Sequence, residues 1–202
     1  MVPLPAPAAL SAAALVAYHD ASLAGAAPSC PESPLWQAIE ANHHHNCSLW
    51  AEEDLARRRH VADAEIAANK RAIDQHNQKR NDAIERIDEA LLAALGPVPP
   101  QPHARLHSET AGAMVDRLSI LSLKIHHMRL QTERTDVDAG HIQACHAKLA
   151  RLLEQRTDLA ACLDRLLDEA RRGESYFKVY RQFKMYNDPA LNPAIYGAKA
   201  RP

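Results

Sequence analysis

Residues 70–88 carry polar side chains at positions where an amphipathic helix would carry apolar ones. Ile73 and Ile84 recur at helical spacing, yet His76, Asn77 and Arg80 occupy the same stripe between them. A polar group that is buried without a hydrogen-bond partner costs about 1 to 3 kcal/mol. The stretch therefore predicts a site at which polar side chains meet partners, water or a ligand.

The helix that carries this stretch needs a neighbour. No glycine or proline occurs between Pro34 and Gly96, and one helix of that span would be roughly 90 Å long. A compact domain of this size has a radius of gyration of about 16 to 17 Å. We therefore expect residues 35–58 and 64–95 to form an antiparallel hairpin that turns near residues 59–63, with Asp63 as the cap of the second helix.

In this hairpin apolar residues face apolar residues and polar residues face polar ones. The apolar pairs are Leu35 with Ile87, Ile39 with Ile84, and Trp50 with Ile73. The polar groups that meet are His43 and Asn46 with Arg80, Asn77 and His76, and Glu53 and Asp54 with Lys70. Such a match is what a deliberate buried polar layer requires.

Most of the candidate ligand-binding residues have side chains that donate or accept hydrogen bonds, and one, Trp50, offers a flat aromatic face. Arg80 and Lys70 suit a phosphate or a carboxylate. A structural network that only fixes the helix register is the open alternative. The candidates are His43, Asn46, Trp50, Glu53, Asp54, Lys70, Asp74, Asn77, Arg80, Asn81 and, on a third predicted helix, Asp116 and Lys124.

Metal chemistry receives weaker support from the sequence. The three histidines His43, His44 and His45 point about 100° apart on a helix, so they cannot all bind one ion. Glu40 and His43 form one ExxH pair, but a diiron bundle needs two such pairs and two further glutamates. We therefore assign no metal ligands, and the sequence identifies no cofactor.

Two further enzyme hypotheses rest on acidic residues and a thiol. Glu52 and Glu53, followed by Glu85 and Asp88, resemble the carboxylates of all-α pyrophosphohydrolases that hold magnesium, although the next expected acid is replaced by Ala56. Cys47 lies beside Asn46 but lacks a defined base, and inert buried thiols are commoner than nucleophilic ones. A metal-assisted phosphate-ester hydrolase therefore stays open as an alternative.

The composition predicts an all-α protein. Only 6 glycines and 4% aromatic residues occur among 202 residues, which favours helix over sheet. A formal net charge of -1 does not provide the excess positive charge that nucleic-acid binding requires, so no nucleic-acid partner is expected. The N-terminal apolar run is too short to span a membrane. The four cysteines show no CxxC spacing of the kind found in metal sites. A reducing cytoplasm is the expected location by default.

The expected architecture is an antiparallel bundle of about four long helices with short terminal helices. Besides the hairpin, we expect a helix over residues 11–23, a helix from residue 110 or 112 to 133, and one from about 140 to 173. A short helix is expected over residues 175–186, which carry regularly spaced aromatic residues. Residues 1–10 are expected to be a mobile leader, 11–196 one domain and 197–202 a tail.

The chain carries a set of motifs that occur together: His43, Asn46, Leu49-Trp50, Glu53-Asp54, Arg57, KRxIDxxNQxRNDxIxxID from Lys70, DRLSILxLKI from Asp116 and YRQFKMYNDPxLNP from Tyr180. With these motifs, the sequence resembles an uncharacterised bacterial family known as domain of unknown function 4254. The resemblance covers residues 11–196, and His76 stands where the family pattern has leucine. It implies an α-helical protein that acts beside glycosyltransferases for surface polysaccharides. The expected role is binding a polar or anionic small ligand, such as a sugar nucleotide; the alternative protein-partner role is a scaffold for a glycosyltransferase.

Overall fold

The computed structural model describes residues 10–26, 28, 30–183 and 190–191. Within them nearly all of the regular secondary structure is helical, which confirms the all-α class. The elements are α1 (Ala12–Leu23), α2 (Pro34–Ala56), α3 (Asp63–Leu95), β1 (Arg105–Leu106), α4 (Ala111–Thr132), α5 (Ala139–Arg171) and β2 (Ser175–Tyr176). Residues 1–9 of the expected leader and the expected tail at 197–202 lie outside the described residues.

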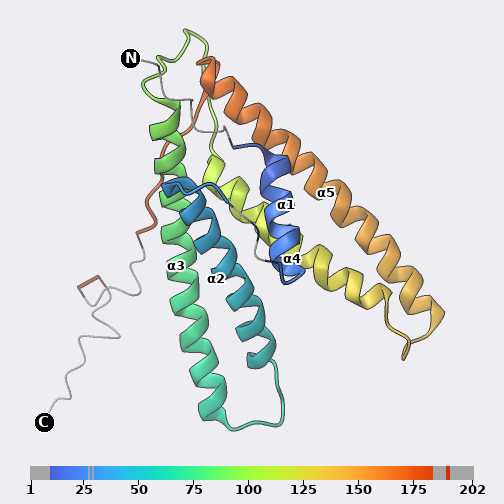
Figure 1. Cartoon of the computed structure of the whole chain (residues 1–202). Coiled ribbons are helices and arrows are strands. Elements are labelled where there is room, and N and C mark those ends of the chain that lie inside the picture. The colour runs from blue at the N-terminus through green and yellow to red at the C-terminus, as the bar shows by residue number, and fades with distance from the viewer. Residues whose placement is uncertain (1–9, 27, 29, 184–189, 192–202) are drawn as a thin grey trace, which may run out of the picture.

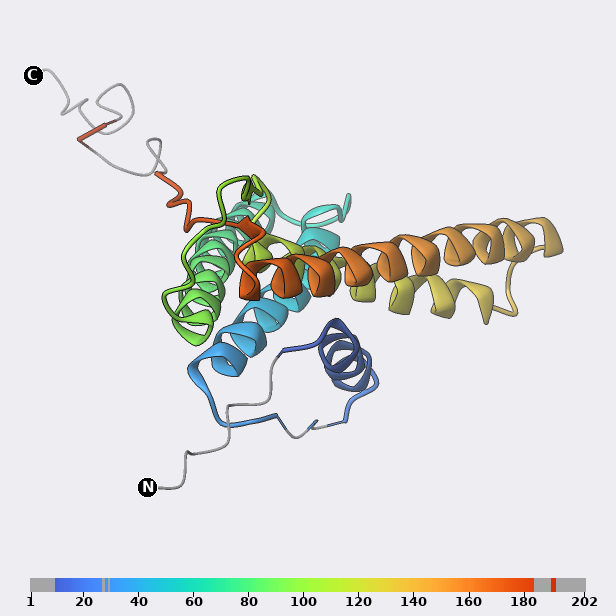
Figure 2. The same ribbon diagram turned by 90° about the horizontal axis from the view of Figure 1, so that it is seen from above.

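The four long helices form two antiparallel hairpins that cross obliquely (Figure 1). Helix α1 packs on α4 and α5, beside the α2–α3 hairpin. Seen from above, the far halves of α4 and α5 extend beyond the other helices (Figure 2). We call this extension the α4–α5 arm, comprising residues 124–155. None of the described helices contains an apolar stretch long enough to cross a membrane.

Local sequence signals explain where most helices begin. Ser11 Oγ accepts a hydrogen bond from the Ala14 N–H at 3.2 Å, and Ser33 Oγ accepts one from the Trp36 N–H at 3.2 Å. Both are N-caps, as expected for serine before a helix. The expected cap at Asp63 is wrong. Helix α3 starts at Asp63, its N-cap is Ala62, and no side chain caps it. The Asp63 carboxylate lies in the first turn instead, where it interacts favourably with the positive end of the helix dipole.

The α2–α3 hairpin turns at the predicted place, between Ala56 and Asp63. Asn69 Nδ2 donates a hydrogen bond to Glu52 Oε2 at 2.8 Å. Nearer the middle of the helices, the Nδ1 atoms of His45 and His76 lie 3.1 Å apart. Both contacts join residues within two positions of the expected register. The apolar ends of the pattern, including the fully buried Ile39 and Ile87, belong to one hydrophobic core.

Helix α4 is the central element, because it contacts the other four helices. Its first turn is fixed to α3, because the Gly112 N–H donates to Asp88 Oδ1 at 2.6 Å. A Cβ atom at Gly112 would lie only 2.5 Å from the Ile84 carbonyl oxygen. The absence of a side chain at this position therefore allows the two helices to approach closely.

The predicted short helix at residues 175–186 is wrong over its described part. Ser175–Tyr176 forms β2, which pairs in parallel with Arg105–Leu106. The following residues run along α3, where Arg181 Nη1 lies 2.7 Å from Glu85 Oε2. Phe177 is buried in the core. Tertiary contacts have thus overridden the helical spacing of the aromatic residues.

Candidate functional site

A buried polar layer lies where α2 crosses α4. Asn42 Nδ2 and Asn46 Nδ2 each donate to Asp116 Oδ1 at 2.9 Å. His43 Nδ1 lies 2.8 Å from Ser119 Oγ, and Asn46 Nδ2 lies 3.1 Å from the same oxygen. All five side chains are buried. We refer to these five residues as the polar layer.

The partners of the α2 polar residues thus come mainly from α4, whereas the sequence pattern places them on α3. Helix α3 contributes Arg80, whose Nε lies 3.9 Å from Asp116 Oδ1. Sequence reasoning placed Asp116 at the site but missed Asn42 and Ser119. Asp116 and Ser119 are three positions apart among the mostly apolar residues 114–123 of α4, and this spacing is the signal that could have identified α4 as the partner.

Arg80 has an unusual environment. Its Nε is buried and has no hydrogen-bond partner among the described residues. The distance of 3.9 Å to Asp116 Oδ1 permits an ion pair but exceeds a hydrogen-bond length. A charged donor in such a position costs more than a neutral one. The Arg80 Nε–H is therefore a hydrogen-bond donor that the polar layer leaves unused.

On the α1 side the layer continues as a pair of stacked imidazoles. The ring centroids of His19 and His43 are 4.5 Å apart. Both nitrogens of His19 are buried and lack a hydrogen-bond partner among the described residues. Burial lowers the pKa of His19 well below its usual value and that of His43 to about 4. Both rings are therefore neutral at physiological pH.

A cavity of about 270 Å³ opens beside the polar layer. Arg57 partly neutralises its acidic wall, since Arg57 Nη2 lies 3.1 Å from Glu53 Oε2 and Nη1 lies 3.3 Å from Asp54 Oδ1. We call this space the polar cavity. Its lining residues are Asn46, Leu49, Trp50, Glu53, Asp54, Arg57, Arg80, Ile120 and Leu123.

A second cavity of about 580 Å³ adjoins the polar cavity and extends under the α4–α5 arm. Trp50 and Asp54 line both. The Trp50 ring stacks on the His127 ring with centroids 4.3 Å apart and an angle of 5° between the planes. We call this space the arm cavity. It was not anticipated from the sequence, because its lining combines side chains from three helices.

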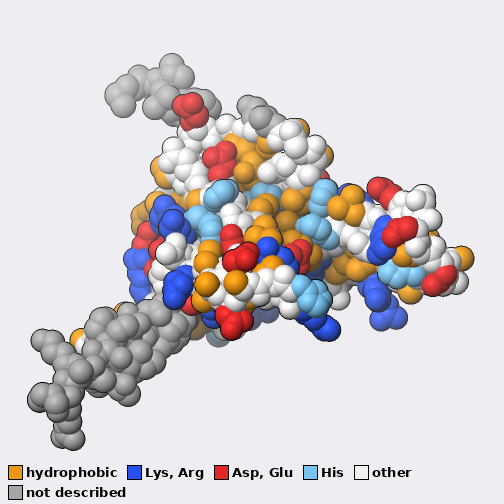
Figure 3. All heavy atoms as spheres, turned by 90° about the horizontal axis from the view of Figure 1, so that it is seen from below, with side chains coloured by type: hydrophobic (Ala, Val, Ile, Leu, Met, Phe, Trp, Pro, Cys, Tyr) orange, Lys and Arg blue, Asp and Glu red, His pale blue; other side chains and the backbone are white. Residues whose placement is uncertain are grey.

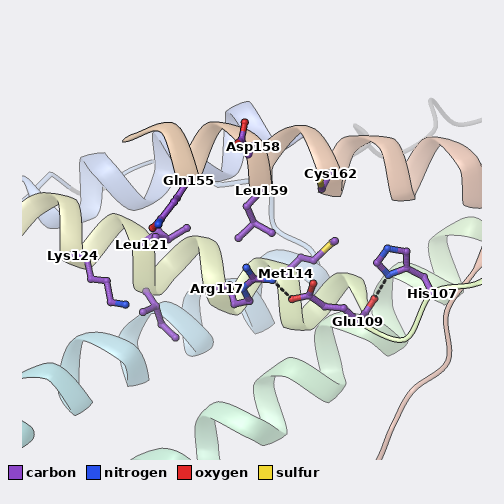
Figure 4. A pocket seen from close by; sticks show the side chains of 11 residues that line it. His107, Glu109, Met114, Arg117, Leu121, Lys124, Gln155, Asp158, Leu159 and Cys162 are labelled. Atoms are coloured by element: carbon purple, nitrogen blue, oxygen red, sulfur yellow. Dashed lines mark hydrogen bonds and ion pairs between the residues drawn. The ribbon is translucent and has the colours of Figure 1, made fainter. Parts of the chain in front are cut away.

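The largest of the three cavities, about 650 Å³, lies between α4, α5 and the loop before α4 (Figure 4). Arg117 and Glu109 point toward each other there and form an ion pair at 2.5 Å. His107 Nδ1 lies 2.7 Å from the Glu109 carbonyl oxygen. Two of its charged side chains, Arg117 and Glu109, are thus already paired, and Lys124 is the only predicted site residue that lines it.

The structure brings most of the predicted site residues together, but not all of them. Lys70 and Asp74 form an ion pair with each other on the exposed side of α3. Asn77 is half-buried and Asn81 is buried on α3, and neither lines the polar cavity. The residues that converge on the polar layer and its two adjoining cavities are His43, Asn46, Trp50, Glu53, Asp54, Arg80, Asp116 and Lys124.

The carboxylates of the hydrolase hypothesis are engaged separately. Glu52 accepts from Asn69, Glu85 pairs with Arg181, and Asp88 binds the first turn of α4. Glu40, the acid of the ExxH pair, is exposed, whereas its partner histidine is buried. Among the described residues, no group of three or more His, Cys, Asp or Glu side chains could hold a metal ion.

The thiol of Cys47 is also poorly placed for nucleophilic chemistry. Its Sγ lies 3.7 Å from His43 Nε2. Burial raises the pKa of Cys47 and lowers that of His43 to about 4. The thiol therefore stays protonated, and the neighbouring imidazole is too weak a base to activate it.

Sequence comparison adds a family assignment to this geometry. No curated protein matches the chain, and no solved structure matches it. A family model described as "Protein of unknown function (DUF4254)" matches residues 36–179. The matched stretch holds the polar layer and the residues that line all three cavities. The chain therefore belongs to this family, as its sequence motifs predict.

Proposed function

We propose that the polar cavity binds a small hydroxylated ligand, and that Arg80 donates a hydrogen bond to it. Two observations on Arg80 carry the proposal: its side chain lines an open cavity, and its buried Nε has no hydrogen-bond partner among the described residues. An acceptor oxygen of a ligand would remove the cost of this unpaired donor. A purely structural network is expected to satisfy its buried donors internally.

The chemistry of the walls suits a sugar. Asn46 offers an amide, Glu53 and Asp54 offer acceptors, and Trp50 provides a flat face. Hydroxyl groups both donate and accept hydrogen bonds, so they match walls that carry both kinds of group. The volume of about 270 Å³ lies just below the usual range for small-molecule sites, about 300 to 1,000 Å³. It therefore fits a single sugar ring better than a complete nucleotide.

A sugar or sugar nucleotide also agrees with the surface-polysaccharide context and the cytoplasmic location that the sequence leads us to expect. The scaffold hypothesis makes a different prediction. A scaffold for a glycosyltransferase would depend on exposed side chains, and changes in the polar cavity would leave docking unaffected. The hydrolase hypothesis has less support, because the acidic residues on which it rests do not converge.

The proposal is tested by thermal unfolding with uridine diphosphate glucose, glucose and inorganic phosphate at millimolar concentrations. A ligand at 100 times its Kd stabilises the folded state by about 2.7 kcal/mol, or about 5 to 10 °C in Tm for a domain of this size. We expect at least one of the two sugar-bearing probes to stabilise the wild type. Stabilisation by neither would contradict the proposal.

The variant Arg80→Ala should lose most of this shift, measured relative to its own Tm without ligand. Arg71→Ala is the matched control, since Arg71 is exposed on the same helix. Arg80→Lys keeps the charge but loses the planar donor group, and we expect it to bind more weakly than wild type. Equal shifts in wild type and Arg80→Ala would show that the ligand binds elsewhere.

A further inference from the structure

The arm cavity has an apolar floor built from three helices. Trp50 comes from α2, Met128 from α4 and Leu152 from α5, and each is half-buried. The Trp50 ring lies flat against the ring of His127. Burial lowers the pKa of His127, so this ring is neutral near pH 7 and extends the apolar surface.

Three cationic side chains surround this floor. Lys124 comes from α4, while Lys148 and Arg151 are three positions apart on α5 and therefore share a face of that helix. In the part of the chain that the structure describes, none of the three forms an ion pair. Like charges around one hollow repel each other, and an anion placed among them would relieve the repulsion.

The one acidic residue that lines the arm cavity does not compensate these charges. Asp54 Oδ1 lies 3.3 Å from Arg57 Nη1, so its charge is already paired. In the view from below, histidine and hydrophobic side chains are exposed at the base of the α4–α5 arm, with both basic and acidic side chains further along it (Figure 3). The lining of the arm cavity itself is apolar and positively charged, although the whole chain has a formal net charge of -1.

We propose that the arm cavity is a second binding site, which takes an amphipathic anion: a small molecule that joins an aromatic or apolar group to a phosphate. The apolar group would lie on Trp50, Met128 and Leu152. The phosphate would bind the cations of α4 and α5. This site adjoins the polar cavity through Trp50 and Asp54, but its occupation does not require a ligand in the polar cavity.

Both parts of the ligand are needed for physical reasons. The three cations are solvent-exposed, and exposed ion pairs contribute little in water and are screened by salt. Inorganic phosphate alone should therefore bind weakly. An apolar molecule without the charge would leave the three cations uncompensated. The cavity volume of about 580 Å³ lies within the usual range for small-molecule sites.

Isothermal titration calorimetry with three probes tests the proposal. The probes are 1-naphthyl phosphate, which has both parts, inorganic phosphate, which lacks the apolar part, and 1-naphthol, which lacks the charge. We expect 1-naphthyl phosphate to bind at least about tenfold more tightly than either of the other two. Equal affinity for 1-naphthyl phosphate and 1-naphthol, or no binding of 1-naphthyl phosphate, would overturn the proposal.

A double variant locates the bound anion. Lys148→Ala combined with Arg151→Ala removes two exposed charges and should weaken the binding of 1-naphthyl phosphate about tenfold. Arg165→Ala combined with Arg171→Ala is the matched control, because both residues are exposed on α5 outside the cavity. The control should bind within about twofold of wild type. An equal loss in both double variants would reveal a net-charge effect and contradict the site.

Two further experiments distinguish this site from the polar cavity and identify the source of the phosphate. Arg80→Ala should retain its affinity for 1-naphthyl phosphate; loss of binding would place the probe in the polar cavity and overturn the present inference alone.

Co-sedimentation with phosphatidylcholine vesicles, with and without phosphatidic acid, tests a lipid head group. Retention that needs phosphatidic acid, Lys148 and Arg151 identifies a lipid; binding of the soluble probe without retention identifies a soluble ligand.

Discussion

At the scale of single residues, Asp116 holds the polar layer together. Its Oδ1 accepts hydrogen bonds from the amides of Asn42 and Asn46 and also faces Arg80. The side chain is only 10% exposed, so water cannot replace these contacts. The layer is therefore a network whose members depend on one carboxylate, which explains how a half-buried guanidinium is tolerated beside it.

The variant Asp116→Ala should lower the free energy of unfolding by about 2 to 4 kcal/mol, because two buried amides lose an acceptor and Arg80 loses its counter-charge. Urea unfolding measures the difference. Asp82→Ala is the control, since Asp82 is exposed and accepts only from a neighbouring glutamine side chain at 2.7 Å. If the two variants were equally stable, the layer would be solvated rather than buried.

Asp88 predicts a specific pH dependence. Burial raises its pKa to about 6, above the value of about 3.9 expected in the unfolded chain. The folded state therefore binds the Asp88 proton more tightly than the unfolded state does. The stability that this proton contributes is fully present below about pH 4 and is lost as the pH rises through about 6.

The comparison of Asp88→Asn with wild type isolates this effect, because asparagine is neutral at every pH and keeps an oxygen that can accept from the Gly112 N–H. Relative to wild type, the variant should gain about 2 to 3 kcal/mol between about pH 4 and pH 7. Urea unfolding across this range measures the gain. A flat difference between Asp88→Asn and wild type would refute the raised pKa of Asp88.

At the scale of elements, the contact between α3 and the start of α4 fixes how the two hairpins cross. The variant Gly112→Ala would place a methyl group 2.5 Å from the Ile84 carbonyl oxygen and should destabilise the protein by about 1 to 3 kcal/mol. Gly140→Ala, near the start of α5, meets only the Asp138 carboxylate at 3.0 Å and should stay within about 1 kcal/mol of wild type. Chemical denaturation compares them; equal stabilities would mean that α3 and α4 are not in close contact.

The helices also differ in how well their positions and contacts could be predicted from the sequence. The α2–α3 hairpin is predictable because Gly and Pro limit its ends and both helices change from apolar to polar along their length. The partners of its polar residues are not predictable in this way, since Asp116 and Ser119 stand among the mostly apolar residues 114–123 of α4. The segment after Gly173 follows β1 and α3 instead of its own helical spacing, because contacts distant in sequence decide its conformation.

At the scale of the whole molecule, two hairpins cross and leave cavities in the angle between them. The polar cavity lies where α2, α3 and α4 meet, and the arm cavity lies where α2 meets the α4–α5 arm. Five of the predicted site residues, Asn46, Trp50, Glu53, Asp54 and Arg80, line the polar cavity. Others, such as Lys70, belong to the solvent-exposed side of α3, because sequence spacing alone does not tell which face of a helix the third helix covers.

The central claim is that a ligand enters the polar cavity and accepts a hydrogen bond from Arg80 Nε. Heteronuclear NMR of the side-chain N–H groups observes this atom directly, together with the indole N–H groups of Trp50 and Trp36. On titration with uridine diphosphate glucose, we expect the Arg80 Nε–H and Trp50 Nε1–H signals to shift together while that of Trp36, which is buried in the core, stays in place. Unchanged Arg80 and Trp50 signals at saturating ligand would contradict the account.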